Sequence, residues 1–287
     1  TTVEQVQAVM KVCQASKSPV VPRGAGTSLS GGAMPHKNGV VLSVNRLNRI
    51  LEIDAQNRCA TLQPGVRNLQ ISDAVEHLGL YYAPDPSSQI ACTIGGNVAE
   101  NAGGVHCLKY GLTVHNILQV KIVTLKGDLI TLGSTAPDSP GNDLLALMMG
   151  SEGMLGIVVE VVVRLLPRPP LARVLMAAFD DIEKAGNAVA NVIAAGVIPA
   201  GFEMMDRAAI TAAEDFVRAG YPADAEAILL CEVDGTEQEV NTQLERVEAL
   251  LDKAGATQIS LAKDESERIL FWSGRKNAFP AVGRISP

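Results

Sequence analysis

The chain has 287 residues, of which 47% are hydrophobic and 19% are charged. This length suggests about two domains, and the composition excludes a disordered or collagen-like chain because it can form a core. Acidic residues outnumber basic residues by 31 to 24, which gives a formal net charge of -7. We therefore expect no nucleic-acid partner and no direct binding to anionic membranes, since both need clustered positive charge.

The cysteines and the apolar residues exclude further classes of protein and indicate the cellular compartment. The five cysteines are scattered and none belongs to a C-x-x-C pair. A zinc ribbon, an iron–sulfur cluster and a disulfide scaffold are therefore not expected. The sequence has no apolar run as long as a membrane span and no recognisable signal peptide. We expect a reduced, cytoplasmic protein that is not transmembrane.

The first part of the chain alternates apolar runs with turn signals. Thr2 is a candidate N-cap for a helix that carries Val6 and Met10 at helical spacing, and Lys126-Gly127-Asp128 indicates a hairpin turn. Further helices are expected at 68–78 and 142–149, and strands at 19–23, 40–44, 50–54, 59–63, 117–125, 129–132 and 157–166. The prolines of 167–170 then interrupt regular structure, so we place a domain boundary there, between a first domain over 1–168 and a second over 171–287.

The second domain alternates strands with amphipathic helices. Strands are expected at 172–179, 202–205, 227–233 and 257–261, and helices at 180–195, from 206, at 236–254 and at 265–278. This order predicts an α+β sandwich. The last helix runs straight into 284–287, so we expect no closing element and an unfinished domain.

Glycine is concentrated in three windows. Of the 26 glycines, 13 lie within 24–39, 95–111 and 150–156, which together hold 40 residues. Glycine lets a backbone adopt positive φ or approach a ligand closely. Three such windows therefore suggest one large ligand held by backbone amides, although each window taken singly is most often an ordinary turn.

The first window begins after an expected strand and reads Pro22-Arg23-Gly24-Ala25-Gly26-Thr27-Ser28-Leu29-Ser30-Gly31-Gly32. Its amides and hydroxyls suit a pyrophosphate, whose oxygens accept many hydrogen bonds. No Gly-Lys-Ser/Thr follows, which excludes a Walker A loop, and Leu29 stands where a Rossmann fingerprint needs its third glycine. The phosphate loop is therefore of another kind.

The other two windows supply groups suited to a flat heterocycle. The second reads Pro84-Asp85-Pro86-Ser87-Ser88, then Thr93-Ile94-Gly95-Gly96-Asn97, then Asn101-Ala102-Gly103-Gly104. Its asparagines and exposed backbone could bind the polar edge of a heterocycle. The third reads Ser151-Glu152-Gly153-Met154-Leu155-Gly156-Ile157-Val158, just before a strand whose backbone could face a base.

Together these three ordered motifs resemble the flavin domain of FAD-linked oxidases of the vanillyl-alcohol oxidase type. The segments Phe202-Glu203-Met204-Met205-Asp206 and Trp272-Ser273-Gly274-Arg275-Lys276 resemble the C-terminal substrate cap of that family. The resemblance covers essentially the whole chain and is strongest to members such as the glycolate oxidase FAD-binding subunits and the flavin D-lactate dehydrogenases. It implies an α+β fold, with a two-subdomain FAD-binding domain of the p-cresol methylhydroxylase (PCMH) type followed by an incomplete ferredoxin-like cap.

The resemblance assigns roles to residues of this chain. The FAD-binding residues that it implies are Arg23, Gly24, Ala25, Gly26, Thr27, Ser28, Pro84, Ser87, Thr93, Gly95, Gly96, Asn97, Asn101, Gly103, Glu152, Gly156, Ile157 and Val158. Residues 23–28 would surround the pyrophosphate, with the hydroxyls of Thr27 and Ser28 among the donors. The second window would lie along the flavin and its ribityl chain, and the third would hold the adenosine end. Arg275 would pair with the substrate carboxylate, for which its planar donor fork is well suited.

The chemistry implied is oxidation of a small 2-hydroxy acid, glycolate or D-lactate, to the 2-oxo acid. Hydride would pass from C2 to flavin N5 and the electrons to a non-NAD acceptor, either an iron–sulfur or second flavin subunit or a quinone. Such partners would place the protein at the periphery of the inner membrane. The alternatives are a 2-hydroxyglutarate dehydrogenase, a sugar-lactone oxidase or an alkyl-glycerone-phosphate synthase on the same fold, and a catalytically inactive FAD-binding subunit.

The sequence also departs from the family pattern. Members with covalent FAD carry a histidine in the first loop, where this chain has Thr27 and Ser28, so we expect non-covalent FAD. By this resemblance, the first strand of the fold would precede Thr1, and the metal-binding and proton-abstracting histidines of the family would fall beyond Pro287. We therefore expect a fragment with a truncated cap, no metal site and no catalytic base within these residues.

Ordinary structural roles compete with several of these assignments. Among His36, His77, His106 and His115, only His106 follows a flavin-loop motif, and a lone histidine is most often a surface or core residue. Arg275 could instead be a salt-bridged arginine, and Glu152 a local cap. Cys92 and Cys107 lie near the flavin loops, but buried cysteines are most often inert packing residues.

Overall fold

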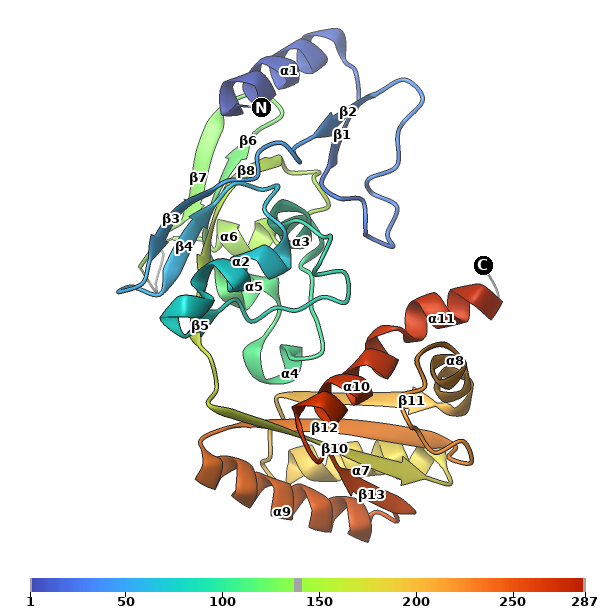
Figure 1. Cartoon of the computed structure of the whole chain (residues 1–287). Coiled ribbons are helices and arrows are strands. Elements are labelled where there is room, and N and C mark those ends of the chain that lie inside the picture. The colour runs from blue at the N-terminus through green and yellow to red at the C-terminus, as the bar shows by residue number, and fades with distance from the viewer. Residues whose placement is uncertain (1, 137–140, 286–287) are drawn as a thin grey trace. The chain divides into compact units, whose positions relative to one another are not determined.

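A computed structural model of the chain describes residues 2–136 and 141–285 (Figure 1). The chain forms two compact units. Unit 1 comprises residues 1–104 and 110–168, and unit 2 comprises residues 105–109 and 169–287. The division after Arg168 falls in the proline-rich stretch, but the short segment 105–109, in the middle of the first domain's sequence, packs with unit 2.

Unit 1 is built on a five-stranded antiparallel sheet with strand order β3-β4-β8-β6-β7. A separate parallel pair joins β1 to β2, and a short antiparallel pair joins β5 to β9. The strands are β1 (Val20–Arg23), β2 (Val40–Ser43), β3 (Ile50–Asp54), β4 (Cys59–Leu62), β5 (Leu80–Tyr81), β6 (Ile117–Val123), β7 (Leu129–Gly133), β8 (Ile157–Arg164) and β9 (Leu166–Pro167). The helices are α1 (Val3–Ser16), α2 (Asn68–Val75), the 3-10 helix η1 (Glu76–Leu78), α3 (Ile94–Glu100), α5 (Thr113–Asn116) and α6 (Leu144–Met148), with α4 (Cys107–Tyr110) beginning in the 105–109 segment.

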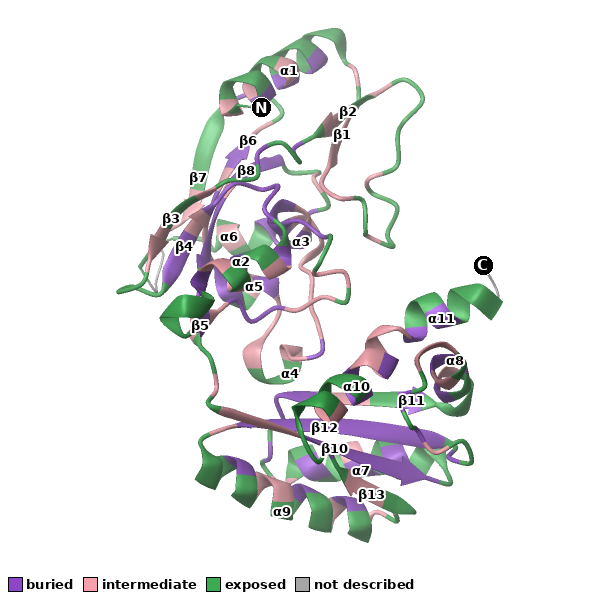
Figure 2. Cartoon of the chain, viewed as in Figure 1, coloured by how far each residue is buried: buried purple, intermediate pink, exposed green. Residues whose placement is uncertain are grey.

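Local signals in the sequence account for several of these elements. Thr2 caps α1 through a capping box, in which its hydroxyl accepts from the Gln5 backbone and the Gln5 side chain accepts in return. The turn at 126–128 joins β6 to β7 as the predicted hairpin. The nearly continuous apolar run of β8 is almost entirely buried, because its side chains belong to hydrophobic clusters on both faces of the sheet (Figure 2).

The second glycine window differs from its prediction. We expected loop structure around Gly95, Gly96 and Asn97, whereas residues 94–100 form α3. The intrinsic cost of glycine in a helix is about 1 kcal/mol per residue. Here it is outweighed because Ile94 and Val98 are fully buried in the core of unit 1, beside β8.

Unit 2 has a four-stranded antiparallel sheet with strand order β11-β12-β10-β13, the order of a ferredoxin-like fold. Its strands are β10 (Leu171–Phe179), β11 (Gly201–Asp206), β12 (Ala227–Gly235) and β13 (Gln258–Leu261), and its helices are α7 (Ile182–Ala194), α8 (Arg207–Val217), α9 (Glu237–Lys253), α10 (Glu265–Lys276) and α11 (Ala278–Ile285). β12 is buried almost throughout and β10 from Val174 to Phe179, since residues from both faces of the sheet belong to hydrophobic clusters (Figure 2).

The end of unit 2 corrects the prediction that no element follows the last helix. That helix, expected over 265–278, ends at Lys276, and α11 follows it and packs on α8. Pro280 lies in the first turn of α11, where its missing N–H breaks no helical hydrogen bond. Residues 286–287, the last part of that prediction, lie outside the described residues.

Candidate functional site

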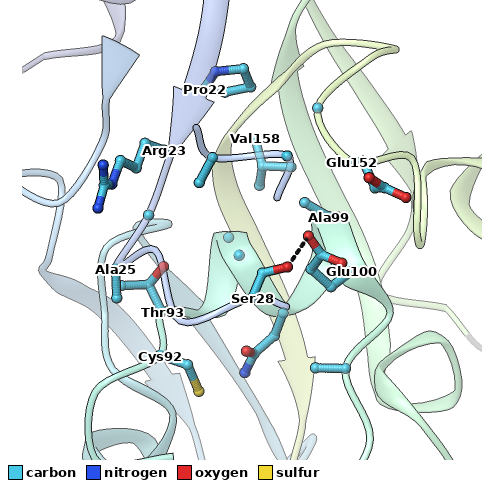
Figure 3. Close-up of a pocket in the computed structure, with 18 of the residues that line it drawn as sticks. Pro22, Arg23, Ala25, Ser28, Cys92, Thr93, Ala99, Glu100, Glu152 and Val158 are labelled. Carbon is cyan, nitrogen blue, oxygen red and sulfur yellow. Dashed lines mark hydrogen bonds between the residues drawn. The ribbon is translucent and has the colours of Figure 1, made fainter. Parts of the chain in front are cut away.

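A pocket in unit 1 brings residues of all three glycine windows to one place (Figure 3). The β1–β2 loop, α3 with the residues before it, and the segment from α6 to the start of β8 contribute its walls. The predicted FAD-binding residues that line it are Arg23, Gly24, Ala25, Gly26, Thr27, Ser28, Thr93, Gly95, Gly96, Asn97, Glu152, Gly156, Ile157 and Val158. Windows separated by more than 100 residues in the sequence therefore form one site.

Four predicted residues are not among those that line the pocket: Pro84, Ser87, Asn101 and Gly103. Two of them have clear roles in holding the wall. The carbonyl of Pro84 accepts a hydrogen bond from the Asn68 side chain (2.9 Å). Asn101 ends α3 in the left-handed conformation, and its side chain accepts from the backbone of Val114. FAD contacts for these residues stay a prediction.

The pocket contains two buried hydroxyl groups with no protein partner. Thr93 Oγ1 and Ser151 Oγ are buried and have no hydrogen-bond partner among the described residues. Thr93 is the N-cap residue of α3, yet its side chain does not bond to the helix amides as an N-cap threonine ordinarily does. A buried unpaired hydroxyl destabilises a protein by about 1–3 kcal/mol. A ligand in the pocket that bonded to these two hydroxyls would offset that cost.

Two glycines of the first window are required by the geometry of the pocket wall. A Cβ at Gly24 would clash with Thr93 Oγ1, so any side chain there would displace that hydroxyl. Gly26 has φ +72°, and a Cβ there would lie 2.6 Å from Nη2 of Arg23. The first loop can thus lie against α3 and the arginine only because both positions are glycine.

The pocket does not bind phosphate through clustered positive charge. Arg23 is the one cationic residue among the described lining residues, and Glu100 and Glu152 are both acidic. A pyrophosphate here would therefore be held mainly by backbone N–H and hydroxyl donors, as in other loops of this type. This donor set, together with the unpaired Thr93 and Ser151 hydroxyls, fits the polar atoms of FAD.

Sequence reasoning did not single out several lining residues. Ser88, Glu100 and Ser151 line the pocket without having been assigned to it, and so does Cys92, which the sequence had suggested as a packing residue. Ser88 and Ser151 stand inside the motifs and could have been found from their position next to assigned residues. Burial raises the pKa of the Cys92 thiol, so at neutral pH it remains protonated and unreactive, which supports its reading as a packing residue.

Unit 2 contains a buried polar cluster centred on Glu232 of β12. The Glu232 carboxylate accepts hydrogen bonds from His106 Nε2 (3.0 Å), Arg268 Nη1 (2.8 Å) and Trp272 Nε1 (2.5 Å). Burial raises the pKa of Glu232, but the bonds from His106 and Trp272 and the Arg268 charge outweigh burial, so the pKa lies below its ordinary value. His106 therefore already has an anionic partner within unit 2.

Arg275 lies on α10 and is paired with a carboxylate of its own unit. Its Nε and Nη2 lie 3.0 and 2.8 Å from the same oxygen of Glu203, on β11. Both side chains are partly exposed, at 31% for Arg275 and 22% for Glu203. The structure thus gives Arg275 the salt bridge that the sequence left as its alternative role, while the guanidinium keeps further N–H groups for a second acceptor.

The other histidines are explained by local structure. His36 and His115 each accept a hydrogen bond from a backbone amide nearby through Nδ1. His77 lies in η1 and is exposed. None of the four histidines lines the pocket as the described residues form it.

Comparisons with known proteins identify both halves of the chain. Residues 1–133 match the model of an FAD binding domain, and residues 168–287 match that of the C-terminal domain of FAD linked oxidases. The chain belongs to the FAD-linked oxidases. Its cofactor is FAD, and it has the two domains of the predicted family. For the described residues, no helix has the length and apolar character needed to cross a membrane.

Individual relatives agree with this assignment. The chain is 66% identical over 284 residues to the glycolate oxidase subunit GlcD of Escherichia coli K12, covering 99% of this chain and 57% of that protein. It is 33% identical over 290 residues to the D-lactate dehydrogenase of Anaerostipes hadrus, covering 98% and 61%. The chain therefore spans little more than half the length of these relatives.

A solved structure supports the fold. That of 4-ethylphenol oxidase from Gulosibacter chungangensis matches with a TM-score of 0.81 at 16% identity, covering 100% of this chain and 63% of that one. Together with the two matched domain models, this likeness confirms the predicted α+β fold class.

Proposed function

We propose that this chain is the FAD-binding and cap portion of an enzyme that oxidises a small 2-hydroxy acid, glycolate or D-lactate, to the corresponding 2-oxo acid. The observation that carries the proposal is the pocket of unit 1, in which Thr93 and Ser151 present buried hydroxyls without partners beside a glycine-rich loop. The names of the two relatives, a glycolate oxidase subunit and a D-lactate dehydrogenase, support this substrate class.

The residues of unit 1 would bind the cofactor without a covalent bond. The backbone of residues 23–28 would surround the pyrophosphate, and the Thr93 and Ser151 hydroxyls would bond to polar atoms that lie deeper in the pocket. When bound, FAD supplies the two-electron acceptor that converts the hydroxyl-bearing carbon to a carbonyl. Non-covalent binding follows from the first loop, which offers Thr27 and Ser28 where covalent members have a histidine.

Arg275 would bind the substrate carboxylate. Its pairing with a single Glu203 oxygen leaves N–H donors on the guanidinium, and a fixed guanidinium fork binds a carboxylate in one orientation. We assign no proton acceptor to the histidines of this chain, because none of the four lines the pocket as the described residues form it.

The electron acceptor would be a partner subunit or a quinone. The E. coli relative is named as a subunit of glycolate oxidase, which supports an assembly with other chains. The cysteines of this chain form no C-x-x-C pair for an iron–sulfur relay of its own. We propose a cytoplasmic location, at the inner membrane only through such partners.

The test is a visible absorption spectrum of the purified chain, before and after acid precipitation. Flavin bands that move to the supernatant are expected and indicate non-covalent FAD. Four substrates are then added under anaerobic conditions: glycolate, D-lactate, D-2-hydroxyglutarate and a sugar lactone. Each is added both to this chain and to a longer chain that has the full length of the relatives. Bleaching by glycolate or D-lactate supports the proposal. Bleaching only by another substrate, or by none in the full-length chain, would favour the alternatives.

A further inference from the structure

The loop between β1 and β2 forms one wall of the pocket but has little packing of its own. None of its residues, 24–39, is buried, and its two large apolar side chains, Leu29 and Met34, are 81% and 71% exposed. A segment with few apolar contacts opens at low free-energy cost. If the loop is preorganised for a ligand, its conformation must therefore be stabilised by polar contacts.

Glu100, at the end of α3, supplies those contacts. Its Oε1 accepts hydrogen bonds from the hydroxyls of Ser28 (2.8 Å) and Ser30 (2.9 Å), as Figure 3 shows for Ser28. The two hydroxyl oxygens also lie 2.7 Å apart, and the Ser30 amide donates to Ser28 Oγ. In the described part of the chain, the side chains of residues 24–39 make no hydrogen bond outside the loop except to Glu100.

The carboxylate itself is held on a rigid support. Ile94 and Val98 of α3 are fully buried, and Asn97 bonds to the buried Asn68 side chain (3.0 Å). Moreover, the C-terminal end of a helix is the end at which a negative charge is disfavoured. Helix stability therefore does not account for a glutamate at position 100, whereas its two serine partners do.

We propose that Glu100 is a positioning residue for the cofactor, which fixes the β1–β2 loop in the shape that receives the FAD pyrophosphate. A serine hydroxyl has one proton, and those of Ser28 and Ser30 are directed to Glu100. The backbone N–H groups of the loop then bind the phosphate. Ser28 contributes by stabilising the conformation of the loop and does not itself donate to the phosphate. This inference rests on FAD binding by unit 1 and is independent of the substrate.

The first test measures FAD affinity by quenching of flavin fluorescence in the Glu100→Ala and Glu100→Gln variants. If the competent loop becomes a minor state, the Kd of Glu100→Ala rises about tenfold. Glu100→Gln keeps an acceptor for a serine and should stay within about threefold of the wild type. The matched control is Glu52→Ala, which removes an exposed carboxylate on β3 and should leave the Kd unchanged.

The second test asks whether Glu100 acts through the two serines. Replacing both Ser28 and Ser30 with alanine should weaken FAD binding about as much as Glu100→Ala does, and the triple variant should be no weaker than either. Additive losses would contradict the proposal, because Glu100 would then act through other contacts. Tighter FAD binding in both Glu100 variants would overturn it as well, since the carboxylate would then merely repel the pyrophosphate.

A third measurement needs no cofactor and separates this inference from the proposed function. Amide hydrogen exchange of the FAD-free protein should be faster in residues 24–39 of Glu100→Ala than of the wild type and of Glu52→Ala, with exchange in α1 and β8 unchanged. Unchanged exchange in the loop would overturn the positioning role even if FAD binds. If exchange in the loop is faster but the protein does not bind FAD, the contact between Glu100 and the loop is supported and the assignment of FAD to the pocket is contradicted.

Discussion

The pocket of unit 1 and the polar cluster of unit 2 differ in whether their buried polar groups have hydrogen-bond partners. In the cluster, the buried Glu232 carboxylate accepts hydrogen bonds from His106, Arg268 and Trp272. In the pocket, the Thr93 and Ser151 hydroxyls are buried with no partner. A cluster that satisfies its own hydrogen bonds stabilises a fold, whereas unpaired buried groups are retained at a cost in stability that a ligand can offset.

The largest effect is expected from removing the centre of the cluster. Glu232→Ala removes the carboxylate that accepts hydrogen bonds from His106, Trp272 and Arg268. We expect unit 2 to lose about 3 kcal/mol of unfolding free energy, measured by urea denaturation. FAD affinity should not change, and a weaker affinity would show that the cluster is part of the cofactor site.

The same carboxylate predicts a pH dependence. In the folded protein the pKa of Glu232 lies below its ordinary value of 4.5, so its contribution to stability is complete above that ordinary value. The contribution is lost as the pH falls through the lower folded pKa. When the pH falls below about 4.5, the unfolding temperature of the wild type should therefore decrease more than that of Glu232→Gln. Parallel curves for the two proteins would contradict this account.

A clash in the pocket should abolish tight FAD binding while unit 2 stays intact. Gly24→Val places a branched side chain against Thr93 Oγ1, and overpacking of this kind costs about 1–3 kcal/mol, so FAD affinity should fall about 100-fold. The matched control is Gly186→Ala in α7, where no atom lies within 4 Å of the new Cβ. An unchanged flavin content in Gly24→Val would mean that the cofactor lies elsewhere.

The role of Arg275 can be separated from that of the pocket. Arg275→Ala in the full-length enzyme should raise the KM for glycolate or D-lactate about 30-fold, since charged hydrogen bonds contribute about 1.5–3 kcal/mol. The FAD spectrum and affinity should be unchanged. A normal KM would assign Arg275 to the salt bridge with Glu203 alone.

A helix or turn could be predicted from the sequence where the residues that determine it are close together in the chain. The capping box at Thr2 and the hairpin at 126–128 follow from residues next to one another, and both were confirmed. The helix α3 was missed because its glycines favour a loop, and only the burial of Ile94 against distant strands outweighs that preference. The helix α11 was not predicted, because it is stabilised by packing on α8, which is distant in the sequence.

The site shows the same division. Glycine motifs identified most of the pocket lining, because close approach of a backbone needs glycine at particular positions. Pairs such as His106 with Glu232, separated by 126 residues, left no signal in a single sequence. The contact of Glu100 with Ser28 was likewise invisible, since neither residue stands in a motif together with the other.

The most direct test of the central claim is the Thr93→Val variant, which removes the unpaired hydroxyl and keeps the shape of the side chain. Without FAD, the unfolding free energy of unit 1 should rise by about 1 kcal/mol, because a buried group without a partner is gone. FAD affinity should fall about fivefold, because the same group bonds to the cofactor. A variant that is less stable without FAD, or that binds FAD as tightly as the wild type, would contradict the claim that this pocket is the FAD site.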